Sequence, residues 1–491
     1  MTVKFGAKYN FLQFFPFQDA RDGKARISLE GRIKAAIDFS LKMLYNVLCM
    51  TKTRPRAHAK GKTMKRTYIK DITPGTHRIS GFVENFRNKK SMAFIVLRDI
   101  TGKMQVTVIK DEHPELLEML DKLTPQSVVT FEGEVVASEY VKLGGIEMYP
   151  TSMKVESYAE ALPIKDDSDI DVRMDYRWID LRREKNHLML ELQTTLTNAM
   201  REFLLQRNFI EIHTPKLIAA ASESGSDVFE VKYFEGNAYL AQSPQFYKQM
   251  AMASGLERIF ETGPVFRAEK SYTNKHATEF SGFDLEFSYI DSFEDVMQME
   301  EELLAYAIAK VKEAHGEKLQ QLFGLELEVP ALPFPRMKLA DVYSELEARY
   351  GYKVPDELKG DLTTEAERMT KQLCRDMFGH EFLFVTDYAK EERAFYHMRN
   401  EAGVPQGYDL IWRGVEITTG AQREHRYDVL RAQAEEKGLA EDVKFYLEFF
   451  KYGCPPHGGF GIGIDRLTML FLDIPIKEVQ FLFRGPNRLT P

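Results

Sequence analysis

Cysteine is scarce in this chain, and the scarcity limits what the protein can be. Only three cysteines occur in 491 residues: Cys49, Cys374 and Cys454. They lie far apart, their number is odd and no CxxC pair is present, which excludes a disulfide-rich secreted scaffold. We therefore expect a reducing compartment, by default the cytoplasm. Cys454 and His457 have no second pair of metal ligands near them in the sequence, which argues against a zinc site.

Long apolar runs are also missing. No stretch approaches the length that a helix needs to cross a bilayer, so no membrane partner is expected. The first residues are partly apolar but contain no signal-peptide core followed by a small-residue cleavage site. The chain has no internal repeat with a period of about 20 to 50 residues, which excludes solenoid and propeller architectures.

An excess of positive charge is absent overall but present locally. The net charge of -8 and the pI of about 5.9 disfavour a protein whose whole surface binds nucleic acid. We predict that residues 1–66 form an N-terminal extension that ends in a basic run. Two interpretations remain open for it, a poorly ordered leader and an arm that contacts the RNA backbone. The run contains no acid, and its basic residues are Lys52, Arg54, Arg56, Lys60, Lys62, Lys65 and Arg66.

Residues 67–160 have the pattern of a small β-barrel. Short strand-like segments are separated by turns, and one helix, predicted for residues 114–123, follows the third of them. Five strands with a helix after the third is the order of an OB-fold, a barrel that binds oligonucleotides. The predicted strands are residues 78–83, 92–98, 104–109, 127–137 and 147–155.

The chain changes character after this segment. Residues 161–183 start with a polar, acidic stretch, and we predict a hinge there. From His187 onward apolar side chains recur at steps of three and four, which predicts an amphipathic helix. A strand at residues 208–212 follows and is interrupted by Pro215. Residues 184–491 continue as alternating strands and helices, and the 44% hydrophobic content supports a large core.

Two predicted strands around residues 263–269 and 278–286 are joined by a loop of charged and small polar residues. Arg267 stands at the end of the first strand and Phe280 at the start of the second. An arginine there can neutralise a phosphate and a phenylalanine can stack on a base. The pattern therefore predicts a nucleotide site on antiparallel strands. A later glycine-rich run does not fit a dinucleotide fingerprint, because Arg466 stands where the third glycine should be.

These segments together resemble the class II aminoacyl-tRNA synthetases, subclass IIb, of the archaeal and eukaryotic type, and most closely their aspartate-specific members. The resemblance covers roughly residues 67–491 and implies an α+β protein. An N-terminal OB-fold barrel that binds the anticodon, residues 67–160, would be followed by a hinge, 161–183, and by a class II catalytic domain, 184–491, with an antiparallel sheet flanked by helices. The helix and strand that end at Pro215 match motif 1, which implies a homodimer.

The resemblance also implies an ATP site. Arg267 and Arg466 would be the catalytic residues, because they contact the α- and γ-phosphates. Glu269 would hold the adenine amino group, and Phe280 would stack on the adenine ring opposite Arg466. His276 would assist with the outer phosphates.

Mg²⁺ is the implied cofactor and would bind with ATP. Glu416 and Thr419 match the pair of residues that holds the ion. The family usually has serine at the second position, and threonine keeps the hydroxyl group. Both oxygen types suit a hard cation.

The remaining expected contacts concern aspartate and tRNA. Lys248 and Arg423 would bind the side-chain carboxylate of aspartate, since a guanidinium matches a carboxylate with two hydrogen bonds. Asp284 would orient these cations, and three residues would face the α-amino end: Ser222, Glu223 and Gln245. Anticodon bases would meet Phe94, Gln105 and, by a looser match, Glu147. Ser271 and Thr273 would meet the acceptor end of the tRNA.

The resemblance implies that the chain activates L-aspartate with ATP and then transfers it to the 3′ end of tRNA-Asp. Two alternatives remain. One is another subclass IIb enzyme, specific for asparagine or lysine. The other is a catalytically inactive, synthetase-like RNA-binding protein, which the presence of Arg267, Glu416, Arg423 and Arg466 disfavours.

Overall fold

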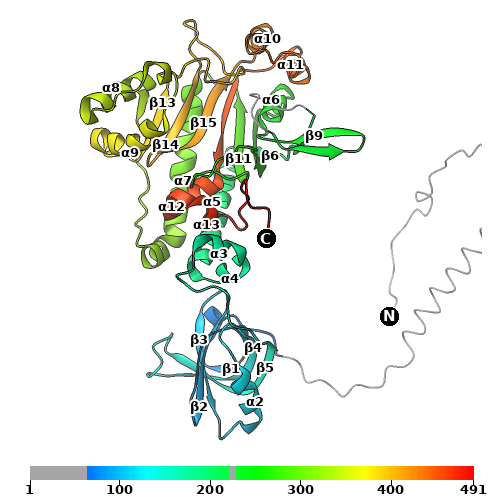
Figure 1. Cartoon of the computed structure of the whole chain (residues 1–491), viewed down its shortest axis with the longest axis vertical. Coiled ribbons are helices and arrows are strands. Elements are labelled where there is room, and N and C mark those ends of the chain that lie inside the picture. The colour runs from blue at the N-terminus through cyan, green and yellow to red at the C-terminus, as the bar shows by residue number, and fades with distance from the viewer. Residues whose placement is uncertain (1–63, 220–227) are drawn as a thin grey trace, which may run out of the picture. The chain divides into compact units, whose positions relative to one another are not determined.

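The computed structural model describes residues 64–219 and 228–491 (Figure 1). These residues form two compact units that meet in the sequence between Ala161 and Leu162. Most of the predicted N-terminal extension, residues 1–63, lies outside the described residues. Among the helices that the structure does describe, none is both long and apolar enough to cross a membrane.

The first unit is a closed five-stranded barrel with the strand order β1-β2-β3-β5-β4. It confirms the predicted OB-fold, including the helix after the third strand. β1 is longer than predicted because its first half pairs with β4 and its second half with β2. Gly81 lies at the change of partner, where a Cβ atom would approach the Arg98 carbonyl to 2.3 Å. The elements are β1 (Gly75–Asn88), β2 (Met92–Arg98), β3 (Lys103–Ile109), α2 (Leu117–Lys122), β4 (Val128–Ala137) and β5 (Ile146–Ser157).

Strand alternation separates the core of the barrel from its outer surface. On β2, Ala93, Ile95 and Leu97 are completely buried in the core. Phe94 falls between them and is only half-buried, because successive side chains of a strand point to opposite faces. Phe94 is therefore an outward-facing aromatic side chain and not part of the barrel core.

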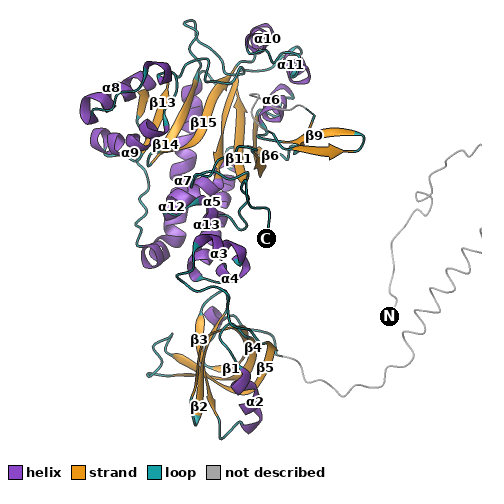
Figure 2. Ribbon diagram, in the orientation of Figure 1, coloured by secondary structure: helices purple, strands orange, loops and turns teal. Residues whose placement is uncertain are grey.

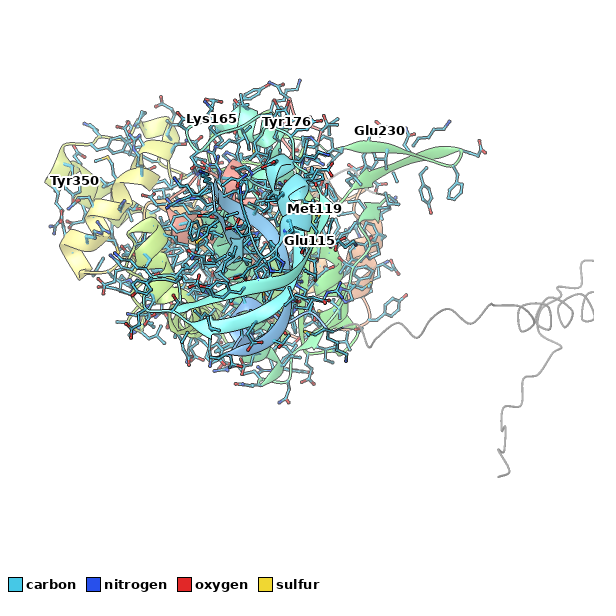
Figure 3. All side chains as sticks on the ribbon, turned by 90° about the horizontal axis from the view of Figure 1, so that it is seen from below. Glu115, Met119, Lys165, Tyr176, Glu230 and Tyr350 are labelled. Carbon is cyan, nitrogen blue, oxygen red and sulfur yellow. The ribbon has the colours of Figure 1, made fainter. Side chains whose placement is uncertain are left out.

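The second unit is built on an eight-stranded sheet with the order β12-β13-β14-β15-β16-β11-β10-β6 (Figure 2). Its pairs are antiparallel except β12–β13 and β10–β6. A separate three-stranded sheet, β7-β9-β8, includes a hairpin that projects from the unit near Glu230 (Figure 3). The strands are β6 (Ile210–Glu211), β7 (Leu217–Ile218), β8 (Glu230–Tyr233), β9 (Gly236–Leu240), β10 (Arg258–Phe266), β11 (Glu279–Ser288), β12 (Arg336–Lys338), β13 (Phe382–Thr386), β14 (Gly407–Trp412), β15 (Val415–Arg423) and β16 (His457–Gly463).

Helices cover the large sheet and bury one of its faces. The predicted amphipathic helix is α5, and it packs on α7 and α12 in the main core of this unit. The helices are α3 (Ile170–Asp175), α4 (Arg177–Asp180), α5 (Glu184–Leu205), α6 (Gln245–Ala253), α7 (Phe293–Phe323), α8 (Leu339–Tyr350), α9 (Thr364–Phe378), α10 (Tyr427–Glu436), α11 (Lys444–Phe450), α12 (Ile464–Leu472) and α13 (Ile476–Val479).

The central strand β11 shows how this packing creates a free face for a site. Phe283, Leu285 and Phe287 join the core beside α5 and α7. Because the side-chain period of a strand is two, Asp284 and Glu286 must point to the opposite face. The sheet therefore presents acidic side chains on the face away from its main core.

Part of the segment predicted as a hinge is helical and belongs to the second unit. Arg177, on α4, has only 1% of its surface exposed. Its guanidinium donates to the Asp180 carboxylate and to the backbone carbonyls of Glu478 and Gln480. These bonds join α4 to α13 and to the residue that follows it.

Candidate active site

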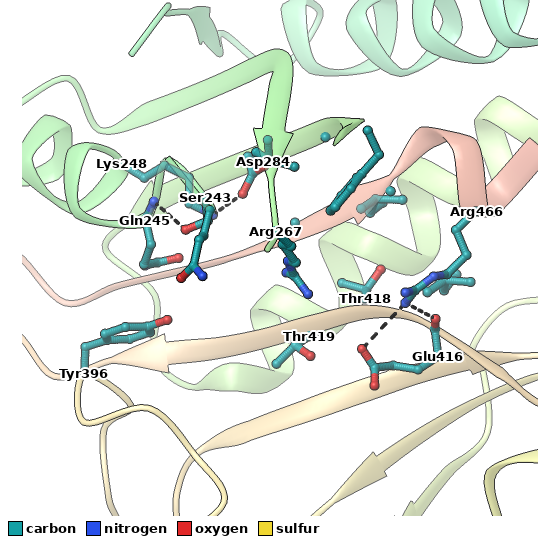
Figure 4. Close-up of a pocket in the computed structure, with 18 of the residues that line it drawn as sticks. Ser243, Gln245, Lys248, Arg267, Asp284, Tyr396, Glu416, Thr418, Thr419 and Arg466 are labelled. Carbon is teal, nitrogen blue, oxygen red and sulfur yellow. Dashed lines mark hydrogen bonds and ion pairs between the residues drawn. The ribbon is translucent and has the colours of Figure 1, made fainter. Parts of the chain in front are cut away.

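A cavity of about 200 Å³ opens on the face of the large sheet away from α5 and α7. Figure 4 shows Gln245, Lys248 and Asp284 at one end, Glu416 and Arg466 at the other, and Arg267 between them. The lining combines side chains from α6, β10, β11, β15 and β16 with the first turn of α12. Residues more than 200 positions apart in the sequence therefore meet around one space.

One end of the cavity holds two buried cations paired with two buried acids. Lys248 Nζ donates to Asp284 Oδ1 at 2.9 Å and lies 3.5 Å from Glu286 Oε2. Arg423 Nε donates to Glu286 Oε1 at 3.0 Å. Burial raises the pKa of the Glu286 carboxyl, but the charges of Arg423 and Lys248 outweigh this effect and hold the pKa below its ordinary value. Glu286 is thus an anion that fixes both cations in place.

Two glycines of β16 make room for this cluster. A Cβ atom on Gly461 would lie 2.6 Å from Asp284 Oδ1, and one on Gly459 would lie 2.4 Å from Glu286 Oε2. Any larger residue would collide with the carboxylates. The glycine-rich run therefore serves close approach between neighbouring strands rather than a turn around phosphate.

Arg423 keeps donors for a ligand after its structural contacts are made. Nη2 donates to the Gly459 carbonyl at 2.8 Å, and Nη1 lies 3.4 Å from Nε2 of His397. Burial and the neighbouring arginines lower the pKa of His397 well below its ordinary value, so its ring is neutral and Nε2 can accept. A guanidinium has five N–H groups, of which these contacts and the bond to Glu286 use three. Two remain for a carboxylate in the cavity.

The other end of the cavity has the features of a nucleotide site. The guanidinium of Arg267 lies 5.5 Å from the centre of the Phe280 ring, in cation–π range. Arg466, on the first turn of α12, donates to the Glu416 carbonyl at 2.8 Å and lies 4.0 Å from its carboxylate. An aromatic ring and two arginines thus face one space, as binding of a base and its phosphates requires.

Glu416 and Thr419 bring oxygen ligands to this end. Burial, and after it the charge of Asp409, raise the pKa of Glu416 above its ordinary value, although 42% of its side chain stays exposed. A nearby cation would relieve this repulsion. Thr419 donates its hydroxyl hydrogen to Asp409 Oδ1 at 2.8 Å, which leaves the oxygen lone pairs for a cation. The donor set therefore fits a hard divalent ion such as Mg²⁺.

No cluster of three or more His, Cys, Asp or Glu side chains that could hold a metal occurs within residues 64–219 and 228–491. An ion beside Glu416 would consequently need oxygens from the bound substrate as well. Cys454 Sγ lies 3.7 Å from His457 Nδ1, and the same Nδ1 atom lies 2.8 Å from the Pro455 carbonyl.

The loop between β10 and β11 carries four further predicted site residues: Glu269, Ser271, Thr273 and His276. His276 Nδ1 lies 3.0 Å from the Ser271 hydroxyl and also contacts the Thr273 hydroxyl. Burial and the nearby positive charges, Arg466 first among them, lower the pKa of His276. Glu269 is exposed at the start of this loop. The structure brings Ser271, Thr273 and His276 together, but neither these three nor Glu269 are among the residues that line the cavity.

Two predicted residues, Ser222 and Glu223, lie outside the described residues. Conversely, sequence reasoning assigned no role to Glu286, His397 and Asp409. A signal existed for Glu286, because it follows Asp284 by two positions on a strand and must share its face. Asp409 begins the segment that leads to Glu416 but was given no role, and His397 lies on a segment that carried no recognisable pattern; only the fold brings His397 to the site.

A second cavity, of about 380 Å³, lies on the barrel. Phe94, Gln105 and Glu147 all line it, as their predicted shared role requires. Gln105 Nε2 lies 3.3 Å from Glu147 Oε2, and the Thr107 hydroxyl donates to the same oxygen at 2.6 Å. Burial raises the pKa of Glu147, but these and other hydrogen bonds lower it by more, so the carboxylate is ionised. An aromatic platform next to polar groups suits an unstacked base.

Comparison with known proteins identifies the family of each unit. Residues 169–484 match the model of class II tRNA synthetases (D, K and N), and residues 77–156 match that of OB-fold nucleic-acid-binding domains. The aspartate–tRNA(Asp/Asn) ligase of Methanopyrus kandleri is 44% identical over 442 residues, which is 87% of this chain and 100% of that protein.

Solved structures show the same architecture. The asparaginyl-tRNA synthetase of Pyrococcus horikoshii with asparaginyl-adenylate is 31% identical, with a TM-score of 0.80 over 87% of this chain and 100% of that one. The aspartyl tRNA synthetase of Entamoeba histolytica is 30% identical, with a TM-score of 0.77 over 89% and 96%. Similarity of fold alone therefore does not separate an aspartate from an asparagine site.

Proposed function

The chain belongs to the class II tRNA synthetases of the group that includes the aspartate, lysine and asparagine enzymes, and we propose that it is an aspartate–tRNA ligase. It joins L-aspartate to ATP, forming aspartyl-adenylate and pyrophosphate, and then transfers aspartate to the 3′ end of a tRNA. Relatives that are named aspartate–tRNA ligases and cover most of the chain support this activity.

One observation carries the choice of aspartate. Arg423 and Lys248 lie at the end of the cavity opposite the nucleotide end, and Arg423 keeps two free N–H donors there. A side-chain carboxylate accepts from both donors. The amide of asparagine offers only one acceptor and would direct its own N–H groups at the guanidinium, and the ammonium of lysine would meet like charges.

The first chemical step needs positioning and charge neutralisation rather than a base, because the aspartate carboxylate is already a nucleophile. In this proposal Arg267 binds the α-phosphate where the carboxylate attacks. Arg466 binds the γ-phosphate and stacks on adenine from the side opposite Phe280. Glu269 holds the adenine amino group and His276 assists the outer phosphates.

Mg²⁺ is the proposed cofactor. Glu416 and Thr419 would hold it, and when bound it would neutralise charge on the phosphates of ATP. The raised pKa of Glu416 and the free lone pairs of Thr419 support this assignment.

The proposed tRNA is tRNA-Asp. Its anticodon would meet the barrel cavity at Phe94, Gln105 and Glu147, and its acceptor end would meet Ser271 and Thr273. We further propose a cytoplasmic homodimer formed through motif 1. Its support is two exposed apolar side chains: Ile210 on β6, an edge strand of the sheet, is 49% exposed, and Leu205 at the end of α5 is 57% exposed.

The test is amino-acid-dependent exchange between ATP and pyrophosphate, measured with aspartate, asparagine and lysine. Exchange with aspartate alone is expected. Exchange with asparagine or lysine instead would assign the chain to that specificity, and no exchange with any would favour the inactive RNA-binding alternative. Charging of purified tRNA-Asp and tRNA-Asn would then define the tRNA. Phe94→Ala should impair charging but leave exchange unchanged, since base stacking contributes about 1–3 kcal/mol to binding.

A further inference from the structure

Behind the amino-acid end of the cavity, four buried polar side chains are joined by hydrogen bonds: Gln245, Gln249, Tyr446 and His457. Gln245 lines the cavity, and its Nε2 donates to Gln249 Oε1 at 2.9 Å. The Tyr446 hydroxyl donates to the same oxygen at 2.9 Å. Gln249 Nε2 lies 3.1 Å from Nε2 of His457. Gln249, Tyr446 and His457 are completely buried.

The direction of every hydrogen bond in this chain follows from one backbone group. His457 Nδ1 lies 2.8 Å from the Pro455 carbonyl, which can only accept. Nδ1 must therefore carry the proton. Burial lowers the pKa of His457 to about 4, so the ring is neutral and holds a single N–H. Its Nε2 atom is then an acceptor, and the atom of Gln249 that faces it must be the amide nitrogen.

The orientation of Gln249 in turn fixes the orientation of the Gln245 amide. Since the Gln249 nitrogen faces His457, its oxygen faces Gln245 and accepts from the Tyr446 hydroxyl at the same time. Because Gln249 Oε1 can only accept, the atom of the Gln245 amide that faces it must be the nitrogen, which donates. The carbonyl oxygen of Gln245 is left for the cavity, where it can accept a hydrogen bond and cannot donate one.

We infer that Gln249, held by His457 and Tyr446, is a positioning residue that fixes the amide of Gln245 with its oxygen toward the cavity, so that this oxygen accepts a hydrogen bond from the α-ammonium group of the amino acid. The inference rests on the proposed function and adds a reason for selecting a free α-ammonium group. A freely rotating glutamine would present its nitrogen part of the time and would then repel the same group.

The experiment compares the wild type with Gln249→Leu and His457→Leu, each of which removes the fixed direction. The readouts are the KM for aspartate in exchange and the inhibition constant of L-malate, which carries a hydroxyl in place of the amine. A hydroxyl can accept as well as donate, so malate tolerates either orientation of Gln245. We expect the KM for aspartate to rise about tenfold and the inhibition constant of malate to change by less than about twofold.

A smaller effect is expected for Tyr446→Phe, about two- to threefold on the KM for aspartate, because His457 still fixes Gln249. Tyr343→Phe is the matched control: this buried tyrosine of α8 donates to the Asp361 carbonyl and should leave both constants unchanged. An equal rise of the KM for aspartate and of the inhibition constant of malate, or no change in either constant, would overturn the inference. Absence of aspartate-dependent exchange in the wild type would instead refute the proposed function.

Discussion

Replacing Arg423 with leucine removes both the ion pair with Glu286 and the donors proposed to bind the substrate carboxylate. The structure allows the two effects to be measured separately. The guanidinium is 3% exposed and is the nearest partner of Glu286, which is completely buried. Without it, Glu286 is left with Lys248 at 3.5 Å. Removing one partner of a buried ion pair costs about 3–5 kcal/mol of stability.

The same substitution removes the two donors proposed to bind the substrate carboxylate. Losing such a pair costs about 3–5 kcal/mol of transition-state stabilisation, or roughly 10²- to more than 10³-fold in kcat/KM for aspartate. The affinity for ATP should change little, because Arg423 lies at the other end of the cavity. A loss of activity in this variant alone would not distinguish a missing substrate contact from a damaged fold.

The double variant Arg423→Leu with Glu286→Gln makes that distinction. It leaves no unpaired buried carboxylate, so most of the lost stability should return, while exchange with aspartate should stay abolished. Both tryptophans, Trp178 and Trp412, lie in the second unit, and Trp412 is 1% exposed, so fluorescence in urea follows the unfolding of that unit. If the double variant regains exchange together with stability, Arg423 serves only to hold Glu286 and its assignment to the substrate is wrong.

Three further predictions address the metal, a buried acid and the N-terminal extension. Thr419→Ser should retain activity, whereas Thr419→Val should lose the bond to Asp409 and raise the Mg²⁺ concentration needed for exchange; an unchanged Mg²⁺ titration for valine would remove Thr419 as a ligand. Burial raises the pKa of Glu300 to about 8 from an ordinary 4.5, so the folded state binds this proton more tightly and stability should fall as pH rises between these values. Glu300→Gln keeps an acceptor for the Tyr408 hydroxyl and should flatten that dependence in thermal unfolding; an identical pH profile would contradict it. Deleting residues 1–66 should leave exchange intact and make log tRNA affinity less steep against log salt, whereas equal slopes would show an idle leader.

Local periodicity was sufficient to predict the barrel and the long helix. The buried positions of α5 recur with the helical period, and all five strands of the barrel lie where alternation placed them. The limits of elements were harder to predict. β1 extends beyond residues 78–83 because both neighbouring strands pair with it, and β6 shrinks to two residues because Asn208 leaves the helix in a left-handed conformation, φ 61°.

The site was predicted less evenly, for a physical reason. Residues that touch a ligand carry a recognisable pattern, and Gln245, Lys248, Arg267, Glu416 and Arg466 do line one cavity. Residues that hold those side chains in place have no such pattern, because any nearby group of the right polarity can form the hydrogen bond or ion pair that is needed. His397, Asp409 and Gln249 belong to this second kind. Gln249 follows Gln245 by one turn of α6, whereas His397 and Asp409 reach the site only when distant strands pack together.

Hydrogen-bond direction is a further property that the sequence does not contain. A glutamine is the same letter whether its oxygen or its nitrogen faces a ligand, and either orientation fits the same space. At Gln245 the orientation is set by the backbone carbonyl of Pro455. Three hydrogen bonds, through His457 and Gln249, connect that carbonyl to Gln245. Because a carbonyl has no donor, it imposes one orientation on the whole chain. Selection of an ammonium group would thus depend on a residue whose side chain takes part in none of these bonds, which is why no pattern of residue types could have predicted it.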